Sequence, residues 1–143
     1  MEILNDLFLV AVYSVAGIAL MMLGNFLIDL IVPCHFPTEI QKGNTAVGWF
    51  SAGSFIGIGT ILRAAIMSPA VQQAEESLGA GLINSIIYFA VGIVFFMVGY
   101  VLVNLFNKKY NLNEEIGKGN EAAGIMVFGI FIGLAIVISG VIM

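Results

Sequence analysis

Four long apolar runs separated by short polar stretches dominate the pattern of this chain. They cover Leu7–Val32, Thr45–Met67, Leu82–Phe106 and Ala122–Met143, and none of them contains an internal proline. A helix crosses a hydrocarbon layer of about 30 Å with roughly 20 apolar residues, so each run predicts one transmembrane helix. Because the connections are short, neighbouring helices are expected to be antiparallel. The predicted fold class is an all-α membrane protein with four transmembrane helices.

Composition supports this interpretation. The chain has 143 residues, of which 60% are hydrophobic and 10% are charged, and its mean hydropathy is +1.06. A soluble domain has roughly 45–50% apolar and 25% charged residues. Four spans and their connections use nearly the whole chain, which leaves no room for a soluble domain. The N-terminal segment is acidic where a cleaved signal peptide would be basic, so we expect the first helix to be retained.

The chain contains an internal duplication. Glu39–Met67 and Glu115–Met143 align without a gap, share thirteen of twenty-nine residues, and both begin with Glu-Ile-x-Lys-Gly-Asn-x-Ala-x-Gly. We assign residues 1–76 to one repeat and 77–143 to the other. Each repeat has two spans, which predicts parallel repeats related by a pseudo-two-fold axis along the membrane normal. The preceding helices match one residue out of phase: Tyr13, Gly17, Gly24 and Asp29 correspond to Tyr88, Gly92, Gly99 and Asn104.

Glycines recur in register in both repeats and predict helix-packing seams. In lipid, small residues let helix backbones approach closely. The second helix of each repeat carries a GxxxG motif, which predicts packing of the second span against the fourth, or of either against another subunit. The first helix of each repeat carries two glycines seven residues apart, which share a helix face. The residues are Gly53, Gly57, Gly129 and Gly133 in the GxxxG motifs, and Gly17, Gly24, Gly92 and Gly99 in the first helices.

The repeated motif followed by a glycine-rich span resembles the YjfL-like bacterial inner-membrane family, catalogued as domain of unknown function 350. The resemblance covers almost the whole chain. It implies a four-helix inner-membrane protein of two repeats and no established activity. Some members of that family are associated with membrane-stress and envelope systems, which suggests a cellular context.

Charge near the helix ends predicts the orientation. Lys42, Lys108, Lys109 and Lys118 all fall in the first and third connections. Cytoplasmic loops retain an excess of Lys and Arg, so these connections are predicted to be cytoplasmic and both termini to lie outside. The middle connection has Glu75 and Glu76 and no basic residue, which agrees with this orientation.

The repeated motif has a structural and a functional interpretation. Structurally, the Gly-Asn pairs are turns followed by helix caps, and the lysines are interfacial anchors. Functionally, a Glu and an Asn at each helix N-terminus would bracket an ion entrance. The residues concerned are Glu39, Lys42, Gly43 and Asn44 in the first repeat, and Glu115, Lys118, Gly119 and Asn120 in the second.

Few polar residues lie inside the spans. Asn25 and Asp29 are one turn apart, and Tyr100 and Asn104 occupy the matching positions, so the four predict one inward polar strip, which could line a path. Arg63 has no basic repeat partner; it would reach the interface, form a salt bridge with Glu75 or Glu76, or contact an anion. Trp49, early in the second span, is predicted to be an interfacial anchor.

Several function classes are disfavoured. No basic face suits nucleic acid, and Cys34 with His35 would supply at most two metal ligands. No nucleophile constellation or nucleotide loop is present, so we expect no enzyme activity and no cofactor. The sequence favours a small channel or permease-like subunit in the bilayer, which would have to be a homo-oligomer. The alternative is a non-transporting scaffold that recruits cytoplasmic stress or envelope proteins.

Overall fold

The computed structural model describes residues 2–68, 77–107 and 109–143, and these residues are helical over most of their length. Four long helices match the four apolar runs and are long and apolar enough to cross a membrane. Two short helices lie in the first and third connections. In chain order the helices are α1 (Glu2–Asp29), α2 (Phe36–Gln41), α3 (Thr45–Ile66), α5 (Leu78–Phe106), α6 (Leu112–Gly117) and α7 (Glu121–Ile142).

The helix ends differ from the apolar runs where local chemistry sets them. Helix α1 begins five residues before Leu7 and so includes the acidic residues Glu2 and Asp6, which are favourable in the first turns of a helix. It ends at Asp29, a few residues before Pro33, whose ring disfavours helical backbone at the preceding position. Helix α5 begins at Leu78, earlier than the apolar run, because the hydroxyl of Ser77 accepts a hydrogen bond from the Ala80 N–H at 3.2 Å.

The polarity of the first and third connections predicted simple loops, but each connection contains a short helix. Helix α2 has a proline in its first turn, where the missing N–H has no intrahelical partner in any case. Helix α6 is capped by the side chain of Asn111, which accepts from the N–H groups of Asn113 and Glu114. Each connection therefore folds into a helical corner that carries the repeated motif.

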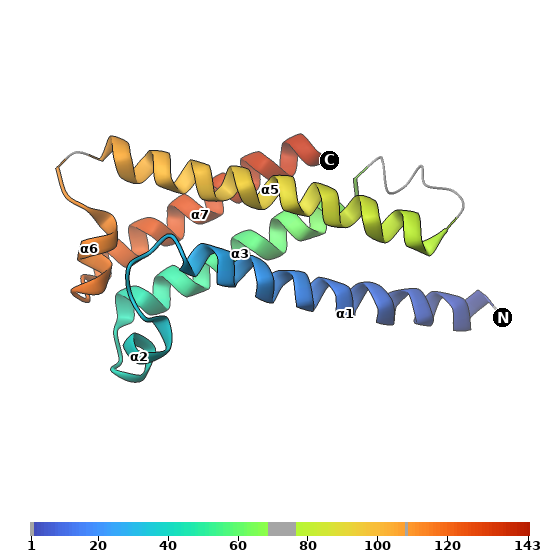
Figure 1. Ribbon diagram of the computed structural model, residues 1–143, viewed down its shortest axis with the longest axis horizontal. Helices are drawn as coiled ribbons and strands as arrows, with labels where there is room; N and C mark the ends of the chain where they lie inside the picture. The colour runs from blue at the N-terminus through green and yellow to red at the C-terminus, as the bar shows by residue number, and fades with distance from the viewer. Residues whose placement is uncertain (1, 69–76, 108) are drawn as a thin grey trace.

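The two repeats run in the same direction through the molecule. Helices α1 and α5 are parallel to each other, and α3 and α7 return in the opposite direction (Figure 1). Helices α2 and α6 lie together at one end, while both chain termini lie toward the other end. The duplicated hairpins are thus parallel, and the two motif-bearing corners share one end of the bundle.

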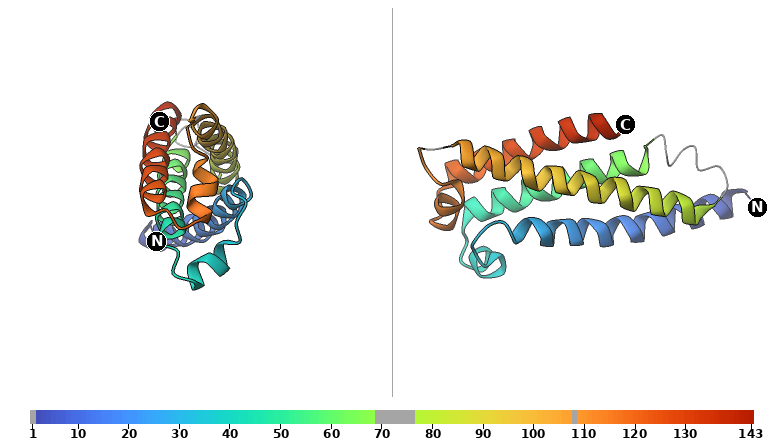
Figure 2. Two further views of the ribbon diagram at one scale, coloured as in Figure 1. Left: turned by 90° about the vertical axis from the view of Figure 1, so that its left-hand side faces the viewer. Right: turned by 45° about the horizontal axis from the view of Figure 1, so that its top comes forward.

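Helix α3 is the centre of the bundle. It packs against α7 along much of its length and also contacts α1 and α5. In the end-on view of Figure 2, α3 lies between α7 and α5. In the most apolar 18-residue stretch of α3, half of the residues are buried within the chain. In that of α1, only 6% are buried. The remaining apolar surface of the outer helices faces the surroundings, as expected of helices whose solvent is lipid.

Glycines of the first helix in each hairpin face branched side chains of the second helix. A Cβ built on Gly24 would lie 3.1 Å from Ile58, and one built on Gly99 would lie 2.7 Å from Leu134. Ile58 and Leu134 are equivalent positions of the two repeats. The packing within a hairpin is therefore the same in both copies, and it uses the glycine seam predicted for the first helices.

The contacts between the hairpins are not reciprocal. A Cβ on Gly53 would lie 2.8 Å from the Cα of Phe128, and one on Gly124 would lie 2.6 Å from the Cα of Ala46. Their repeat partners Gly129 and Gly48 have no other described residue within 4 Å of such a Cβ. A strict two-fold axis would make these contacts equal. The repeats are parallel, but their interface uses one face of the first hairpin and a different face of the second.

Within one chain, only the first GxxxG motif makes a close helix approach. Gly57 accommodates the ring of Phe96 from α5, where a Cβ would lie 2.6 Å from the ring edge. Its counterpart Gly133 is open among the described residues. The glycine of α7 that does touch α3 is Gly124, which lies outside the GxxxG pattern and is the last residue of the repeated motif.

Candidate functional site

The first copy of the repeated motif forms a closed polar corner between α2 and α3. Gly43 has a φ of +76°, which a side chain would strain, so the turn requires glycine. The Asn44 side-chain N–H donates to the Glu39 carboxylate at 3.0 Å, and its carbonyl oxygen accepts from the Val47 N–H at 3.2 Å. Lys42 pairs with Glu39 at 3.0 Å. Asn44 thus caps α3, as predicted.

The second copy has the same turn but a different set of partners. Gly119 has a φ of +82°. Asn120 donates to the Glu115 carboxylate at 2.8 Å, but its side chain makes no cap hydrogen bond to α7. The predicted cap is therefore wrong for Asn120, whose amide is turned toward the carboxylate. Lys118 pairs with Glu114 at 2.8 Å and with Glu115 at 3.5 Å.

A hydrogen bond from Asn44 joins the two corners. The Asn44 amide also donates to the main-chain carbonyl of Ile116 in α6, at 3.1 Å. Ile116 is fully buried, so this bond anchors the second corner against the start of α3. The repeat partner Asn120 has no matching bond to Ile40, because the hairpins do not pack reciprocally. Asn44 therefore has a structural role that its duplicate lacks.

The motif carboxylates of both corners are held by local hydrogen bonds and ion pairs. Hydrogen bonds from Asn44 and then Lys42 hold the pKa of Glu39 below its ordinary value. The pKa of Glu115 is lowered in the same way, chiefly by the hydrogen bond from Asn120. The pKa of Lys118 is raised, first by its hydrogen bond to Glu114. Both carboxylates therefore stay ionised through the physiological range, each held by an amide and an ammonium group.

Three of the four residues of the predicted polar strip bond through their side chains to separate partners, and the side chain of the fourth, Asp29, has none among the described residues. Asn25 accepts a hydrogen bond from the buried hydroxyl of Ser54 at 2.7 Å. Asn104 accepts from the N–H of Leu112 at 3.1 Å, which ties the end of α5 to the start of α6. Asp29 is half-buried, and its carboxylate has no hydrogen-bond or ion-pair partner among the described residues.

Tyr100 belongs to a chain of contacts that the sequence did not suggest. Its hydroxyl donates to the side chain of Asn113 at 2.6 Å, and Asn113 donates to the carbonyl of Ile31 at 3.2 Å. These bonds connect α5, α6 and the segment after α1. The sequence did not predict a role for Asn113, because its repeat partner is Pro37 and the residue is therefore not repeated in the duplication.

Two further residues were predicted to lie at the membrane interface. Trp49 donates through its indole N–H to Glu121 at 3.3 Å and packs edge-on against Phe128, with 5.4 Å between ring centroids. It joins α3 to α7 at the end that carries the motif corners. Arg63 is exposed in the last turn of α3. Its proposed partners Glu75 and Glu76 lie outside the described residues, as does Lys108.

Aromatic rings fill the space between α3, α5 and α7. Phe50, Phe131 and Phe96 are buried in one cluster, in which Phe50 and Phe96 each lie 4.9 Å from Phe131 between ring centroids. Tyr100 closes the cluster toward the motif end, 5.0 Å from Phe131. The polar groups around it serve helix ends and corners. At the second corner, Glu115 and Asn120 also line an open pocket of about 350 Å³ together with Tyr110, Ala122 and Ala123.

These features define a class: a multi-pass α-helical membrane protein made of two parallel helical hairpins, each with a polar corner at the same end. The family model for a Domain of Unknown Function (DUF350) matches twice, at residues 2–78 and 77–143. The chain belongs to this family, and the duplication in the sequence is a duplication of the family domain.

Two relatives are transmembrane proteins. UPF0719 transmembrane protein YshE of Bacillus subtilis (strain 168) is 25% identical over 135 residues, which cover 94% of this chain and 93% of the relative. A UPF0719 transmembrane protein of Aquifex aeolicus (strain VF5) is 27% identical over 140 residues. That match covers 96% of this chain and 50% of the Aquifex protein. No solved structure matches the chain.

Proposed function

We propose that this chain is a non-transporting, non-catalytic scaffold of the bacterial inner membrane. In this proposal the end with α2 and α6 faces the cytoplasm, and both termini lie outside. Lys42, Lys109 and Lys118 at that end support the orientation, because cytoplasmic segments retain basic residues. The partners would be cytoplasmic proteins of membrane-stress or envelope systems.

The observation that carries the proposal is the closed interior of the bundle. The aromatic cluster fills the space between α3, α5 and α7, and each motif carboxylate accepts a hydrogen bond from its own asparagine and pairs with a lysine. A conducting path would need polar groups that face water and remain free to bind an ion. The polar groups of the corners stabilise turns and helix ends, which suits a rigid platform.

The surface of this platform offers side chains for docking. Ile40 on α2 is 48% exposed and Tyr110, just before α6, is 44% exposed. Glu114 and Lys118 on α6 pair with each other and have side chains 62% and 59% exposed. Apolar and aromatic groups bordered by paired charges are typical of a surface that binds another protein.

Site-specific photocrosslinking tests the scaffold. A photoreactive phenylalanine analogue at Gln41 or Gly117, both exposed, should capture a defined soluble protein in intact cells. The same analogue at Val94, which is 57% exposed on the apolar surface of α5, is the control. Ile40→Ser should weaken capture at Gln41 without changing expression. Adducts at Gln41 and Gly117 that contain only lipid or this chain would contradict the scaffold.

The second candidate is a channel formed between copies of the chain, and Asp29 favours it. This carboxylate is half-buried near the end of α1 and has no partner in the described part of the chain. A path past Asp29 would have to run between chains, because the single bundle is closed. Proteoliposomes that pass cations, with a flux reduced at least tenfold by Asp29→Asn, would favour the channel over the scaffold. Ion-tight proteoliposomes would remove it.

A further inference from the structure

The second hairpin covers a defined face of the first, here called the front face. On α3 this face contains Gly53, Gly57 and Ile61. Gly53 packs against Phe128, Gly57 against Phe96, and Ile61 against Gly92. Beside it, α1 and α3 form a groove that α5 fills almost completely, so that about 10 Å³ is left. Six residues of α1 and α3 line the groove, and three residues of α5 fill it: the lining is Tyr13, Ala16, Gly17, Leu20, Leu62 and Ile66, and the filling is Leu82, Ser85 and Ile86.

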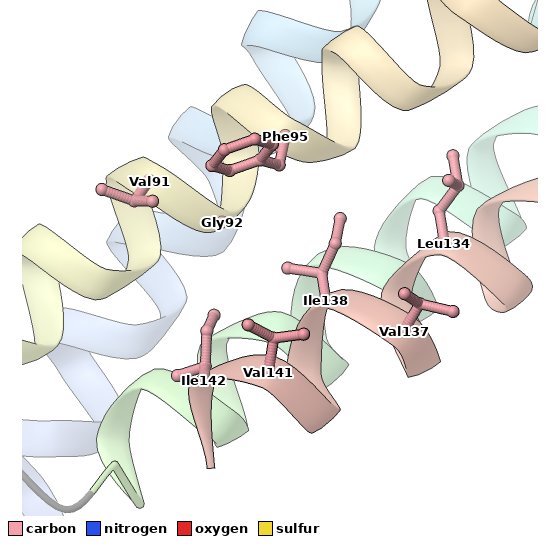
Figure 3. Close-up of a pocket in the computed structure, with 8 residues that line it drawn as sticks. All are labelled: Val91, Gly92, Phe95, Leu134, Val137, Ile138, Val141 and Ile142. Atoms are coloured by element: carbon pink, nitrogen blue, oxygen red, sulfur yellow. The ribbon is translucent and has the colours of Figure 1, made fainter.

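The equivalent front face of the second hairpin is open. Gly129 and Gly133 have no other described residue within 4 Å of a Cβ, and Val137 is 66% exposed. The equivalent groove, between α5 and α7, is empty and has a volume of about 330 Å³ (Figure 3). Its lining includes Val91, Gly92, Phe95, Ile138 and Ile142, which are the repeat partners of five of the six residues that line the filled groove.

The surface of the second hairpin that does the covering is here called the back face. On α5 it includes Phe89 and Ile93, which are 3% and 2% exposed. The equivalent back face of the first hairpin is open: Leu7, Val10 and Ile18 on α1 are 60%, 62% and 56% exposed. On α3 the open back face continues with Gly48, Ala52 and Phe55, of which Phe55 is 41% exposed.

We propose that a second copy of this chain seats the back face of its first hairpin on the front face of the second hairpin. Within each chain, the front face of the first hairpin is covered by the back face of the second. The remaining front face and back face are open, and the internal contact shows how such faces fit together. Such an interface is head-to-tail, so it joins copies into a ring if the rotation closes. Close packing over Gly129 and Gly133 would supply the contact energy in lipid. The inference holds for either candidate function, because it concerns assembly and not activity.

A crosslink between two tagged chains tests the contact. The internal contact of Gly53 with Phe128 translates, by repeat equivalence, into a contact of Gly129 in one copy with Ala52 in the next. We would place Gly129→Cys in one chain and Ala52→Cys in a differently tagged chain, both with Cys34→Ser, and oxidise them in native membranes. The mixed dimer should form at least tenfold above either single variant alone.

The control pair carries Val15→Cys in one chain and Ala90→Cys in the other. Both residues are exposed, occupy equivalent depths and lie outside the proposed interface. Mixed dimers no more abundant than this control would overturn the proposal, and so would single variants that crosslink to themselves as efficiently as the mixed pair. The first result would leave lipid chains as the occupant of the groove, and the second would indicate a two-fold interface.

A second measurement does not depend on disulfide formation. Gly133→Phe should fill the open front face and reduce the protein mass of the complex, measured by light scattering in lipid nanodiscs, to that of one chain. Ala90→Phe, the same kind of change on an exposed part of α5 outside the interface, should leave the mass unchanged. Since Gly133 has no described neighbour within 4 Å, the variant should keep wild-type helix content. A wild-type mass of one chain, or an unchanged mass for Gly133→Phe, would overturn the proposal.

Discussion

Replacing Gly124 with alanine places a methyl group where α7 crosses α3. Its Cβ would lie 2.6 Å from both the Cα and the carbonyl oxygen of Ala46. These are backbone atoms, so the helices themselves must move apart. Overpacking costs about 1–3 kcal/mol, and a contact this short against backbone places the cost near the upper end. Alanine recovers about 1 kcal/mol of helix propensity, so we expect a net loss of about 2 kcal/mol.

The repeat supplies a matched control for this variant. Gly48 is the equivalent of Gly124 in the first hairpin, and a Cβ there would have no other described residue within 4 Å. Gly48→Ala has the same propensity gain without a clash inside the chain, so in dissociated chains its stability should be unchanged or up to about 1 kcal/mol higher. The two variants should differ by about 2–3 kcal/mol, although each adds one methyl group to a helix at equivalent positions.

Reversible unfolding in mixed micelles of a mild detergent and sodium dodecyl sulfate measures the difference. The single tryptophan, Trp49, lies 5.4 Å from Phe128 across the same crossing, so its fluorescence reports separation of α3 from α7. Helical circular dichroism provides an independent signal. If Gly124→Ala is as stable as Gly48→Ala, the close approach of the two backbones does not determine the packing of the hairpins, and the reasoning is refuted.

Two further predictions concern the motif corners. Asn44→Ala should destabilise the bundle by about 1–2 kcal/mol, because it removes the cap of α3 and the bond to α6. Asn120→Ala should cost less than about 1 kcal/mol, because Asn120 makes no cap hydrogen bond. Comparable losses for the two variants in the same unfolding assay would contradict this prediction. The second is a pH dependence. The lowered pKa of Glu39 means that its contribution is complete above the ordinary glutamate value of about 4.3 and disappears as the pH falls through the lower folded-state value. Stability should therefore decline below about pH 4, and Glu39→Gln should flatten that decline, whereas an unchanged pH profile would contradict the assignment.

Much of the fold was predictable because it depends on local or periodic patterns. Apolar runs of spanning length determine where helices cross the membrane, and the duplicated motif at Glu39 and Glu115 requires two equivalent hairpins with the same direction. The positive φ of Gly43 and Gly119 also follows from the Gly-Asn turn that both repeats contain. The short helices α2 and α6 were missed because six residues are too few to show an apolar period.

The candidate site was predictable in its members but not in its partners. Asn44 and Asn120 follow the same local sequence, yet only Asn44 caps its helix and reaches Ile116. Asn113 became visible only in space, because it meets Tyr100 and Ile31 from different helices. Hydrogen bonds between distant segments depend on how the hairpins pack, and no spacing in the sequence encodes that.

The sequence by itself determined the four spans, their alternation and the two parallel copies of one hairpin, since each of these follows from hydrophobic length and repetition. Only the tertiary structure decided which copy of each repeated residue is buried. Gly53 lies under Phe128 while Gly129 lies open, and Gly124 meets Ala46 while Gly48 is free. Identical residues differ in this way because burial depends on what lies across the helix face. Two hairpins in a head-to-tail contact always leave one face of each kind without a neighbour.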